Sequence, residues 1–187
     1  MRKIIILFVS FVSFILNSNA QKKININTEQ STIKWTGELT FHFGGHDGYI
    51  KFKKGFFIKK GDKITGGEFI IDMNSMTNSD IKEQEGKDSL INHLKDPDFF
   101  DVEKFPLTSL LITKVEYSKN NEARIEAELT LKGITKPINF RANFDFDKKE
   151  MNTRFKIDRR KWNVNYTSKV KDYAISDALG FEVMIKL

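Results

Sequence analysis

Three histidines are the side chains in this sequence best suited to metal or acid–base chemistry: His42, His46 and His93. His42 and His46 are four residues apart, a spacing that would place them on one face of a helix, but Gly44 and Gly45 favour a loop. Their spacing to His93 matches no defined zinc site. We therefore expect no metal, and interpret the histidines as polar residues of loops and caps.

A group of carboxylates is the second candidate for chemistry. It surrounds Pro97, where acidic residues usually cap or solvate a turn. A general acid and base would need a defined cleft and separated pKa values. The chain also has no Cys, so thiol nucleophiles and disulfides are excluded. We predict no catalytic residue among these carboxylates, which are Asp96, Asp98, Asp101 and Glu103.

Basic residues at two places could contact the polar head group of a ligand. Arg159 and Arg160 interrupt a strand pattern and could bind a phosphate, although a solvated turn explains them equally well. Lys54 falls on the apolar parity of its strand, just before Gly55. Either Lys54 points inward to a head group, or a β-bulge at Lys54-Gly55 shifts the register. The bulge is favoured because Phe57 also breaks the pattern.

Strands must position these side chains, because alternation of apolar and polar residues dominates the sequence. From Glu122 to Lys132 every second residue is apolar, and after a break at Gly133 to Pro137 the alternation resumes as far as Asp147. This pattern is typical of an antiparallel hairpin with one buried face. At least eight such strands must share one interior, as a sandwich or a barrel. The other runs cover residues 22–28, 31–37, 49–59, 65–73, 107–117, 151–158 and 181–187.

A short helix followed by an aromatic turn is predicted near residues 88–101. Asp88 or Ser89 can cap this helix, and Pro97 limits its extension. Phe99 and Phe100 form the aromatic turn. We expect this element, the only sizeable one that is not a strand, to close one end of the sheet structure.

The first 20 residues have the pattern of a secretory signal peptide. A basic start is followed by an apolar run over residues 4–16 and by small residues before Gln21. The run is shorter than the ~20 residues that a membrane-spanning helix needs. We expect cleavage before Gln21 and one domain over residues 21–187. Loss of Arg2 and Lys3 lowers the formal charge from +6 to +4.

The remaining positive charge does not predict a nucleic-acid partner. The lysines alternate with Glu and Asp along many strands, and no basic tract is interleaved with aromatic residues at one place. A mixed, solvated surface explains them better. Transient contact with an anionic membrane surface is compatible with this charge, and the sequence leaves the oligomeric state open.

Short motifs occur in a fixed order along the chain: Ser31 to Trp35, His46-x-Gly48, Gly66-Gly67-x-Phe69-x-Ile71-Asp72-Met73, His93-Leu94-x-x-x-x-Phe99-Phe100-Asp101, Lys104-Phe105-Pro106, Leu129-Thr130-Leu131-Lys132-Gly133-x-Thr135-Lys136-Pro137 and Ile157-Asp158-Arg159. Together they resemble the YceI-like family of bacterial lipid- or polyisoprenoid-binding proteins. The resemblance extends from about Ser31 to Leu187 and implies an exported, most commonly periplasmic protein, with secretion as the alternative. It also implies an all-β, extended lipocalin-like antiparallel barrel of about eight strands.

The barrel interior implied by the resemblance would hold a long apolar chain, such as an isoprenoid or isoprenoid quinone, for transport, storage or sequestration. No other cofactor is expected. Small inward residues either leave room for this ligand or fit the taper of a filled core, and the resemblance favours the first. A lipid-modifying enzyme and a filled structural or interaction barrel are the alternatives. The predicted apolar tunnel consists of Phe52, Phe56, Phe69, Ile71, Ala123, Ile125, Ala127, Leu129, Phe140, Ala142, Phe144 and Phe155.

Overall fold

The computed structural model describes residues 21–40, 44–166 and 175–187. The predicted signal peptide and His42 therefore lie outside the described residues. Within the described ranges no helix is long and apolar enough to cross a membrane.

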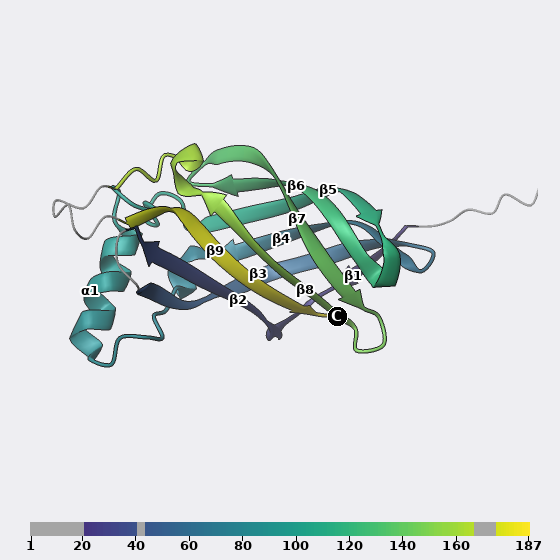
Figure 1. Cartoon of the computed structure of the whole chain (residues 1–187), viewed down its shortest axis with the longest axis horizontal. Coiled ribbons are helices and arrows are strands. Elements are labelled where there is room, and N and C mark those ends of the chain that lie inside the picture. Colours follow the sequence, from purple (N-terminus) through teal and green to yellow (C-terminus); the bar gives the residue numbers. More distant parts are fainter. Residues whose placement is uncertain (1–20, 41–43, 167–174) are drawn as a thin grey trace, which may run out of the picture.

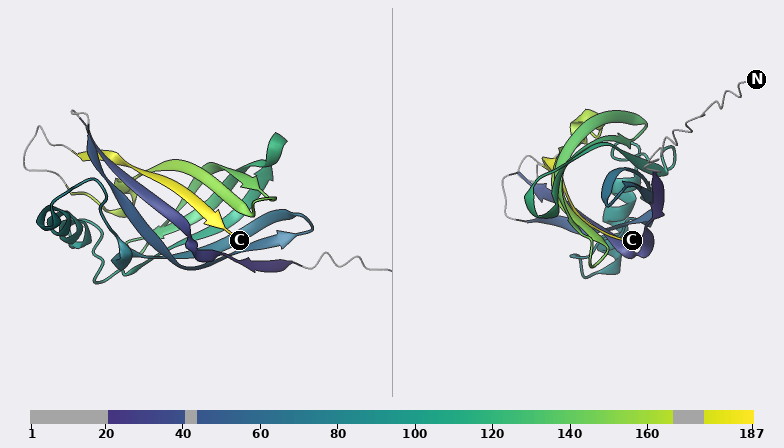
Figure 2. Two further views of the ribbon diagram at one scale, coloured as in Figure 1. Left: turned by 90° about the horizontal axis from the view of Figure 1, so that it is seen from below. Right: turned by 90° about the vertical axis from the view of Figure 1, so that its right-hand side faces the viewer.

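Antiparallel strands close into a barrel, as predicted (Figure 1). The order around the sheet is β1-β3-β2-β9-β8-β7-β6-β5-β4, and the pairing of β3 with β4 closes eight of these strands into a ring. Figure 2 shows this ring in the view along the barrel. The strands are β1 (Lys22–Asn25), β2 (Asn27–Leu39), β3 (Gly45–Lys60), β4 (Lys63–Asp72), β5 (Leu107–Tyr117), β6 (Glu122–Leu131), β7 (Ile134–Asp145), β8 (Glu150–Asp158) and β9 (Ile175–Lys186).

The short strand β1 and the strand β2 lie one after the other along the same edge of β3. Both pair with β3, β1 with residues 56–59 and β2 with residues 45–50. Between them, the Ile26 amide donates a hydrogen bond to the Gly55 carbonyl at 3.1 Å. β1 and β2 thus act together as one interrupted strand, which is why nine strands make an eight-stranded ring.

The predicted hairpin is formed by β6 and β7, but its turn is shorter than expected. Leu131 pairs with Ile134, so that only Lys132 and Gly133 form the turn. Both have positive φ, 50° and 72°, as a two-residue type I′ turn requires. Pro137 therefore lies within β7, where the predicted break is wrong. Its missing amide is tolerated because β8 pairs only with residues 142–145 of β7.

A bulge in β3 reverses the facing of its second half. The register with β4 shifts between Phe52 and Lys54, one residue before the predicted position. Lys54 is consequently exposed, and Phe57 rather than Phe56 points into the barrel, with no exposed surface. Phe56 lies half-buried outside, with the Lys23 Nζ 4.1 Å from its ring centroid. The bulge explanation is confirmed, and the inward placement of Phe56 is wrong.

One α-helix, α1 (Gln84–Lys95), lies at one end of the barrel (Figure 1). It begins before the predicted Asp88, because its first turn is polar and solvent-facing and therefore shows no apolar periodicity. The Asp96 amide ends it by donating to the Asn92 and His93 carbonyls, and Phe99 and Phe100 follow as a buried aromatic turn. The described residues also form the 3₁₀ helices η1 (Met73–Ser75), η2 (Lys119–Asn121) and η3 (Arg159–Trp162).

Candidate functional site

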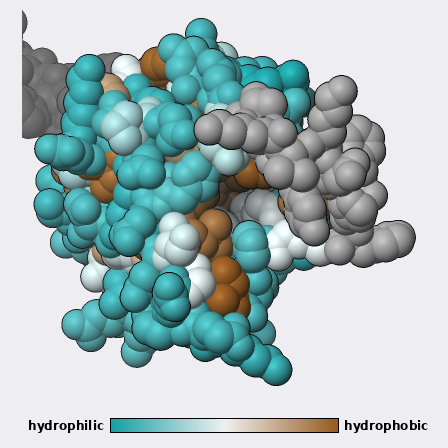
Figure 3. All heavy atoms as spheres, turned by 90° about the vertical axis from the view of Figure 1, so that its left-hand side faces the viewer, coloured by the Kyte–Doolittle hydropathy of each residue, from teal (hydrophilic) through white to brown (hydrophobic). Residues whose placement is uncertain are grey.

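An apolar cavity occupies the half of the barrel nearest α1. Its volume is about 190 Å³. One water needs roughly 10–15 Å³ by a comparable measure, so the cavity has room for roughly a dozen or more methylene-sized groups. Figure 3 shows that the molecular surface is hollowed at this end, with apolar residues around the hollow.

The cavity wall is built from the inward parity of nearly every strand. Its side chains are almost all aliphatic, aromatic or methionine, because period-two alternation turns the charged residues outward. The polar side chains of the wall are those of Glu38, His46, Thr108 and Thr153, together with the indole nitrogen of Trp35. No Lys or Arg side chain in the described part of the chain lines it. The strands contribute Ile33, Ile50, Leu110, Ile112, Leu131, Met151, Ile157, Leu179, Phe181, Val183 and Ile185, among others.

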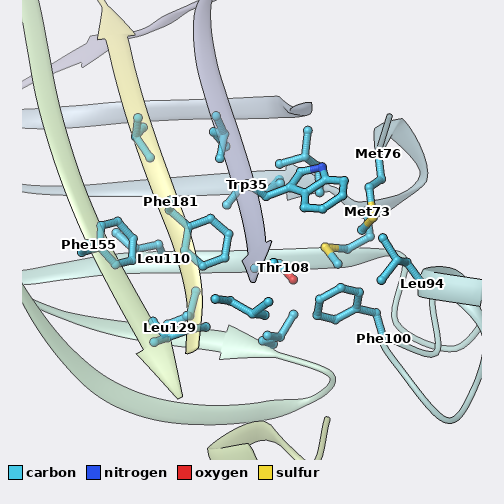
Figure 4. Close-up of a pocket in the computed structure, with 18 of the residues that line it drawn as sticks. Trp35, Met73, Met76, Leu94, Phe100, Thr108, Leu110, Leu129, Phe155 and Phe181 are labelled. Carbon is cyan, nitrogen blue, oxygen red and sulfur yellow. The ribbon is translucent and has the colours of Figure 1, made fainter. Parts of the chain in front are cut away.

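Side chains from η1, α1 and the aromatic turn cover the cavity at its open end. Figure 4 shows Met73, Met76, Leu94 and Phe100 gathered there, with Trp35 next to Met76. Methionine packs adaptably because its side chain is flexible. This cover is the part of the wall that can rearrange with the least disturbance of the strand ladder.

Gly48 allows the segment before α1 to pack closely on β3. A Cβ atom at this position would collide with the Thr77 carbonyl and the Trp35 ring. The Trp35 indole N–H donates to the Thr77 carbonyl at 3.1 Å, and the Thr77 amide donates to the Tyr49 carbonyl at 2.9 Å. The glycine of the His46-x-Gly48 motif is thus required for a backbone contact at the rim of the cavity.

His46 joins this segment to the rim through Asp80. Its Nδ1 lies 2.8 Å from one carboxylate oxygen, and the Asp47 amide donates to the other at 2.9 Å. Partial burial alone would raise the pKa of the Asp80 carboxyl, but the hydrogen bonds from Asp47, His46 and Asn78 hold the pKa below its ordinary value. These hydrogen bonds hold the segment between η1 and α1 against the start of β3.

The far half of the barrel is filled by aromatic rings. Phe69 lies at the inner end of the cavity wall, and its ring centroid is 5.0 Å from that of Phe57. Phe57 in turn contacts Phe144 at 5.9 Å, and Phe144 contacts Tyr117 at 5.7 Å. The Tyr117 hydroxyl accepts a hydrogen bond from the Ile64 amide at 3.0 Å. The cavity is therefore closed at this end.

The structure brings half of the predicted tunnel residues together around the cavity. Those six have inward parity on β3, β4, β6, β7 or β8. Whether they contact a ligand stays a prediction. They are Phe52, Phe69, Ile71, Leu129, Phe140 and Phe155.

The other predicted tunnel residues do not line the cavity. Phe56 is outside the barrel, and the remaining five are buried in the filled part of the interior. Ala123 pairs with Tyr117 on one side and Ala142 on the other, so the small residues accommodate a large neighbour rather than an empty space. The five residues are Ala123, Ile125, Ala127, Ala142 and Phe144.

The basic residues predicted to contact a head group also lie outside the cavity wall. Arg159 is 4% exposed, and its guanidinium is occupied by the Val164 and Ser176 carbonyls and by Asp177. Arg160 is paired with Asp158 and Asp177. Lys54 is exposed because of the bulge. The structure therefore offers none of these cations to a molecule inside the cavity.

His93 lies beside two of the carboxylates of the Pro97 turn. The side chains of His93, Asp96 and Asp98 offer atoms within 4.8 Å of one another. The two carboxylates are exposed, and the His93 ring packs edge-on against Tyr166 at 4.4 Å. Their i, i+3, i+5 spacing matches no defined motif, so the sequence did not predict these three residues as a metal site.

Some residues of the cavity wall were not predicted from the sequence: Thr108, Trp35, the residues contributed by β9, and the methionine cover, which is the group Met73, Met76, Leu94 and Phe100 at the open end. In β5 the alternation is interrupted by a second bulge, between Ile112 and Lys114. The sequence pattern alone therefore did not show that Thr108 and Ile112 face inward. The motif His46-x-Gly48 was the available signal for the rim, because a glycine there implies a close approach.

Comparison with known proteins identifies the family. The YceI-like domain matches residues 20–187. The chain belongs to the YceI-like family. A UPF0312 protein of Pseudomonas putida W619 is 31% identical over 83 residues, which are 44% of this chain and 42% of the relative. A UPF0312 protein of Pseudomonas fluorescens SBW25 is 30% identical over the same shares. The aligned segment thus spans under half the length of these curated relatives.

Solved structures of YceI-type barrels share the fold at low sequence identity. BcnA of Burkholderia cenocepacia has a TM-score of 0.70 and 14% identity, over 86% of this chain and 98% of its own. The Campylobacter jejuni YceI protein has a TM-score of 0.50 and 20% identity, over 98% of this chain and 90% of its own. At these identities the likeness concerns the barrel alone, while the cavity of this YceI-like protein must be interpreted from its own residues.

Proposed function

We propose that this YceI-like protein binds the apolar chain of a lipid in the barrel cavity and holds it without chemical change, for transport, storage or sequestration. One observation carries the proposal: among the described residues, a cavity lined almost wholly by apolar side chains is hollowed at the α1 end (Figure 3) and closed by aromatic rings at the other. An isoprenoid or isoprenoid quinone is the class of chain we favour, from the resemblance to the family. The YceI-like family consists generally of binding proteins, which supports binding over catalysis.

Burial of the chain against the apolar wall is the main source of binding free energy. Each buried methylene-sized group contributes about 0.8 kcal/mol. Roughly a dozen groups would therefore give a gross gain of about 10 kcal/mol, of which the loss of translational and rotational freedom cancels a substantial part. Few polar contacts are needed, in agreement with the sparse polar lining.

We further propose that the mature chain acts outside the cytoplasm, in a periplasm. The support is the signal-peptide pattern of residues 1–20. Transient contact of the barrel with a membrane surface would provide a route for the lipid to enter and leave.

The test is recovery of a lipid from the protein purified from its native export compartment. Denaturing extraction followed by mass spectrometry should return a long apolar molecule in near-stoichiometric amount from the wild type. Val183→Phe, which adds bulk to the cavity wall, should reduce the yield severalfold, and Val183→Ala should retain it. An empty wild-type protein that also takes up no added lipid would contradict the proposal, and a chemically altered lipid after incubation would point to an enzyme.

A further inference from the structure

A single hydroxyl group distinguishes one level of the otherwise apolar cavity. Thr108 is 8% exposed and belongs to the cavity wall, and its hydroxyl has no hydrogen-bond partner in the part of the chain that the structure describes. Figure 4 shows Thr108 between the methionine cover and Leu110, near Phe100. A buried hydroxyl without a partner is unfavourable, so most such groups in folded proteins are paired.

Each of the other polar side chains of the wall has at least one hydrogen-bond partner. The Thr153 hydroxyl donates to the Arg141 carbonyl at 2.6 Å, and both Glu38 carboxylate oxygens accept from Lys156 at 3.1 Å. The Trp35 indole and His46 are bonded to Thr77 and Asp80, as described above. Thr108 differs from them, because its hydroxyl is buried and has no partner among the described residues.

The position of Thr108 suits the head of an amphiphilic molecule. It is the second residue of β5, near the covered end, whereas Ile112 lies four residues deeper in the same wall. At about 3.3 Å per residue, roughly 13 Å of apolar wall separates the two levels. The hydroxyl oxygen itself has almost no exposed surface. A rotation of about 120° about χ1 moves it to another of the three positions around Cβ, so it can turn toward a ligand without a change in the backbone.

Among the described residues, the cavity wall offers no Lys or Arg to an ionic head group. The cations predicted for this task lie outside the wall, and no Lys or Arg in the described ranges replaces them there. An anion placed beside Thr108 would lose its hydration without gaining a partner of opposite charge. A neutral hydroxyl or carbonyl group needs only the one hydrogen bond that Thr108 can form.

We infer that the cavity selects an amphiphile with an uncharged, hydrogen-bonding head group, which binds the Thr108 hydroxyl while its chain extends toward Phe69. This inference rests on the proposed function and makes it more specific. It replaces the expectation of a cationic head-group site by a neutral one.

The experiment is isothermal titration of the full barrel with three C14 probes delivered from cyclodextrin: 1-tetradecanol, tetradecane and tetradecyl phosphate. Wild type should bind the alcohol at least about 10-fold more tightly than the phosphate, because an unpaired buried anion is costly. Thr108→Val should weaken the alcohol about 3- to 10-fold and change the alkane less than about 2-fold, as loss of one hydrogen bond predicts.

Two control variants separate this contact from changes in packing. Thr108→Ser keeps a hydroxyl and should retain the preference for the alcohol. Thr113→Val, on the exposed face of the same strand and outside the cavity wall, should leave alcohol and alkane in their wild-type ratio. Equal binding of the alcohol by wild type and Thr108→Val, or equal binding of alcohol and phosphate by wild type, overturns the inference while the proposed function stands. Failure of wild type to bind any of the three probes overturns both.

Discussion

The hydroxyl of Thr108 has a cost for folding that can be measured without any ligand. Replacing an unpaired buried hydroxyl by a methyl group of similar shape removes an uncompensated polar group. Thr108→Val should therefore raise the free energy of unfolding by about 1 kcal/mol, measured by urea denaturation of lipid-free protein. Thr153→Val should lower it by a similar amount, because the Arg141 carbonyl then loses its donor. A destabilised Thr108→Val would show that the hydroxyl is satisfied in solution.

The Tyr117 hydroxyl is a second group whose hydrogen bond affects the stability of the folded protein. It accepts the amide hydrogen of Ile64, a residue with no exposed surface, and burial raises the pKa of the Tyr117 hydroxyl even though this bond opposes the change. Tyr117→Phe leaves the Ile64 amide without this acceptor. We expect a loss of about 1–3 kcal/mol in the free energy of unfolding and faster hydrogen exchange at Ile64. Unchanged exchange at this amide would mean that another group replaces the hydroxyl.

Residue-level prediction from the sequence succeeded where the strand pattern was undisturbed. Phe140 and Phe155 were placed on the cavity wall because β7 and β8 keep their parity. Phe56 was misplaced because the bulge in β3 reverses the parity after Phe52. Ala123 was placed on the correct face, but whether a small side chain adjoins empty space depends on which large residue faces it, and parity alone carries no such information.

At the scale of elements, the segment between η1 and α1 depends on the Asp80 carboxylate. The pKa of this group is held below its ordinary value of about 3.9 in the folded protein. Its contribution to stability is therefore complete above that ordinary value and is lost as the pH falls through the lowered one. The chemical shift of the Asp47 amide proton, which bonds to Asp80, should titrate with a midpoint below about 3.9.

Asp80→Asn provides the comparison for this titration. The variant should abolish the acid-range change at the Asp47 amide and loosen the segment at neutral pH, visible as faster hydrogen exchange at Thr77 and Ser79, whose amides donate to β3. A midpoint at or above the ordinary value in wild type would contradict the assigned hydrogen bonds.

Element-level prediction was best for the strands and weakest for the connections. The alternation in β6 was sufficient to identify it, and its burial follows that alternation. The boundaries of α1 and of the β6–β7 turn were displaced, since a polar first helical turn and a proline within β7 carry misleading local signals. Closure into a barrel depends on β3 meeting β4, a pairing that strand patterns alone do not distinguish from a sandwich.

At the scale of the whole molecule, one open end and one filled end give the cavity a definite depth. Affinity for a series of n-alkanols should rise about fourfold per added methylene and level off after roughly a dozen or more carbons, when the space beneath the cover is filled. Titration calorimetry with the C8 to C20 alcohols would locate the change of slope. A constant increment through C20 would show that the filled end opens.

Removing the central ring of the filled end should lengthen the cavity. Phe57 contacts both Phe69 and Phe144, so Phe57→Ala creates a void next to the cavity floor. We expect a loss of about 3–5 kcal/mol in the free energy of unfolding and a shift of the limiting chain length to longer alcohols. Phe144→Ala, which is one ring further from the cavity, should destabilise similarly without moving the limit.

The two tryptophans occupy very different surroundings, and this difference gives the protein a built-in optical signal. Trp35 belongs to the cavity wall, whereas Trp162 is 1% exposed and its indole donates to the Leu129 carbonyl at 3.1 Å. Entry of a ligand changes the polarity around Trp35 and leaves Trp162 as an internal standard. The emission spectrum of the unlabelled protein should therefore report whether the barrel is occupied, and Trp162→Phe should isolate that signal.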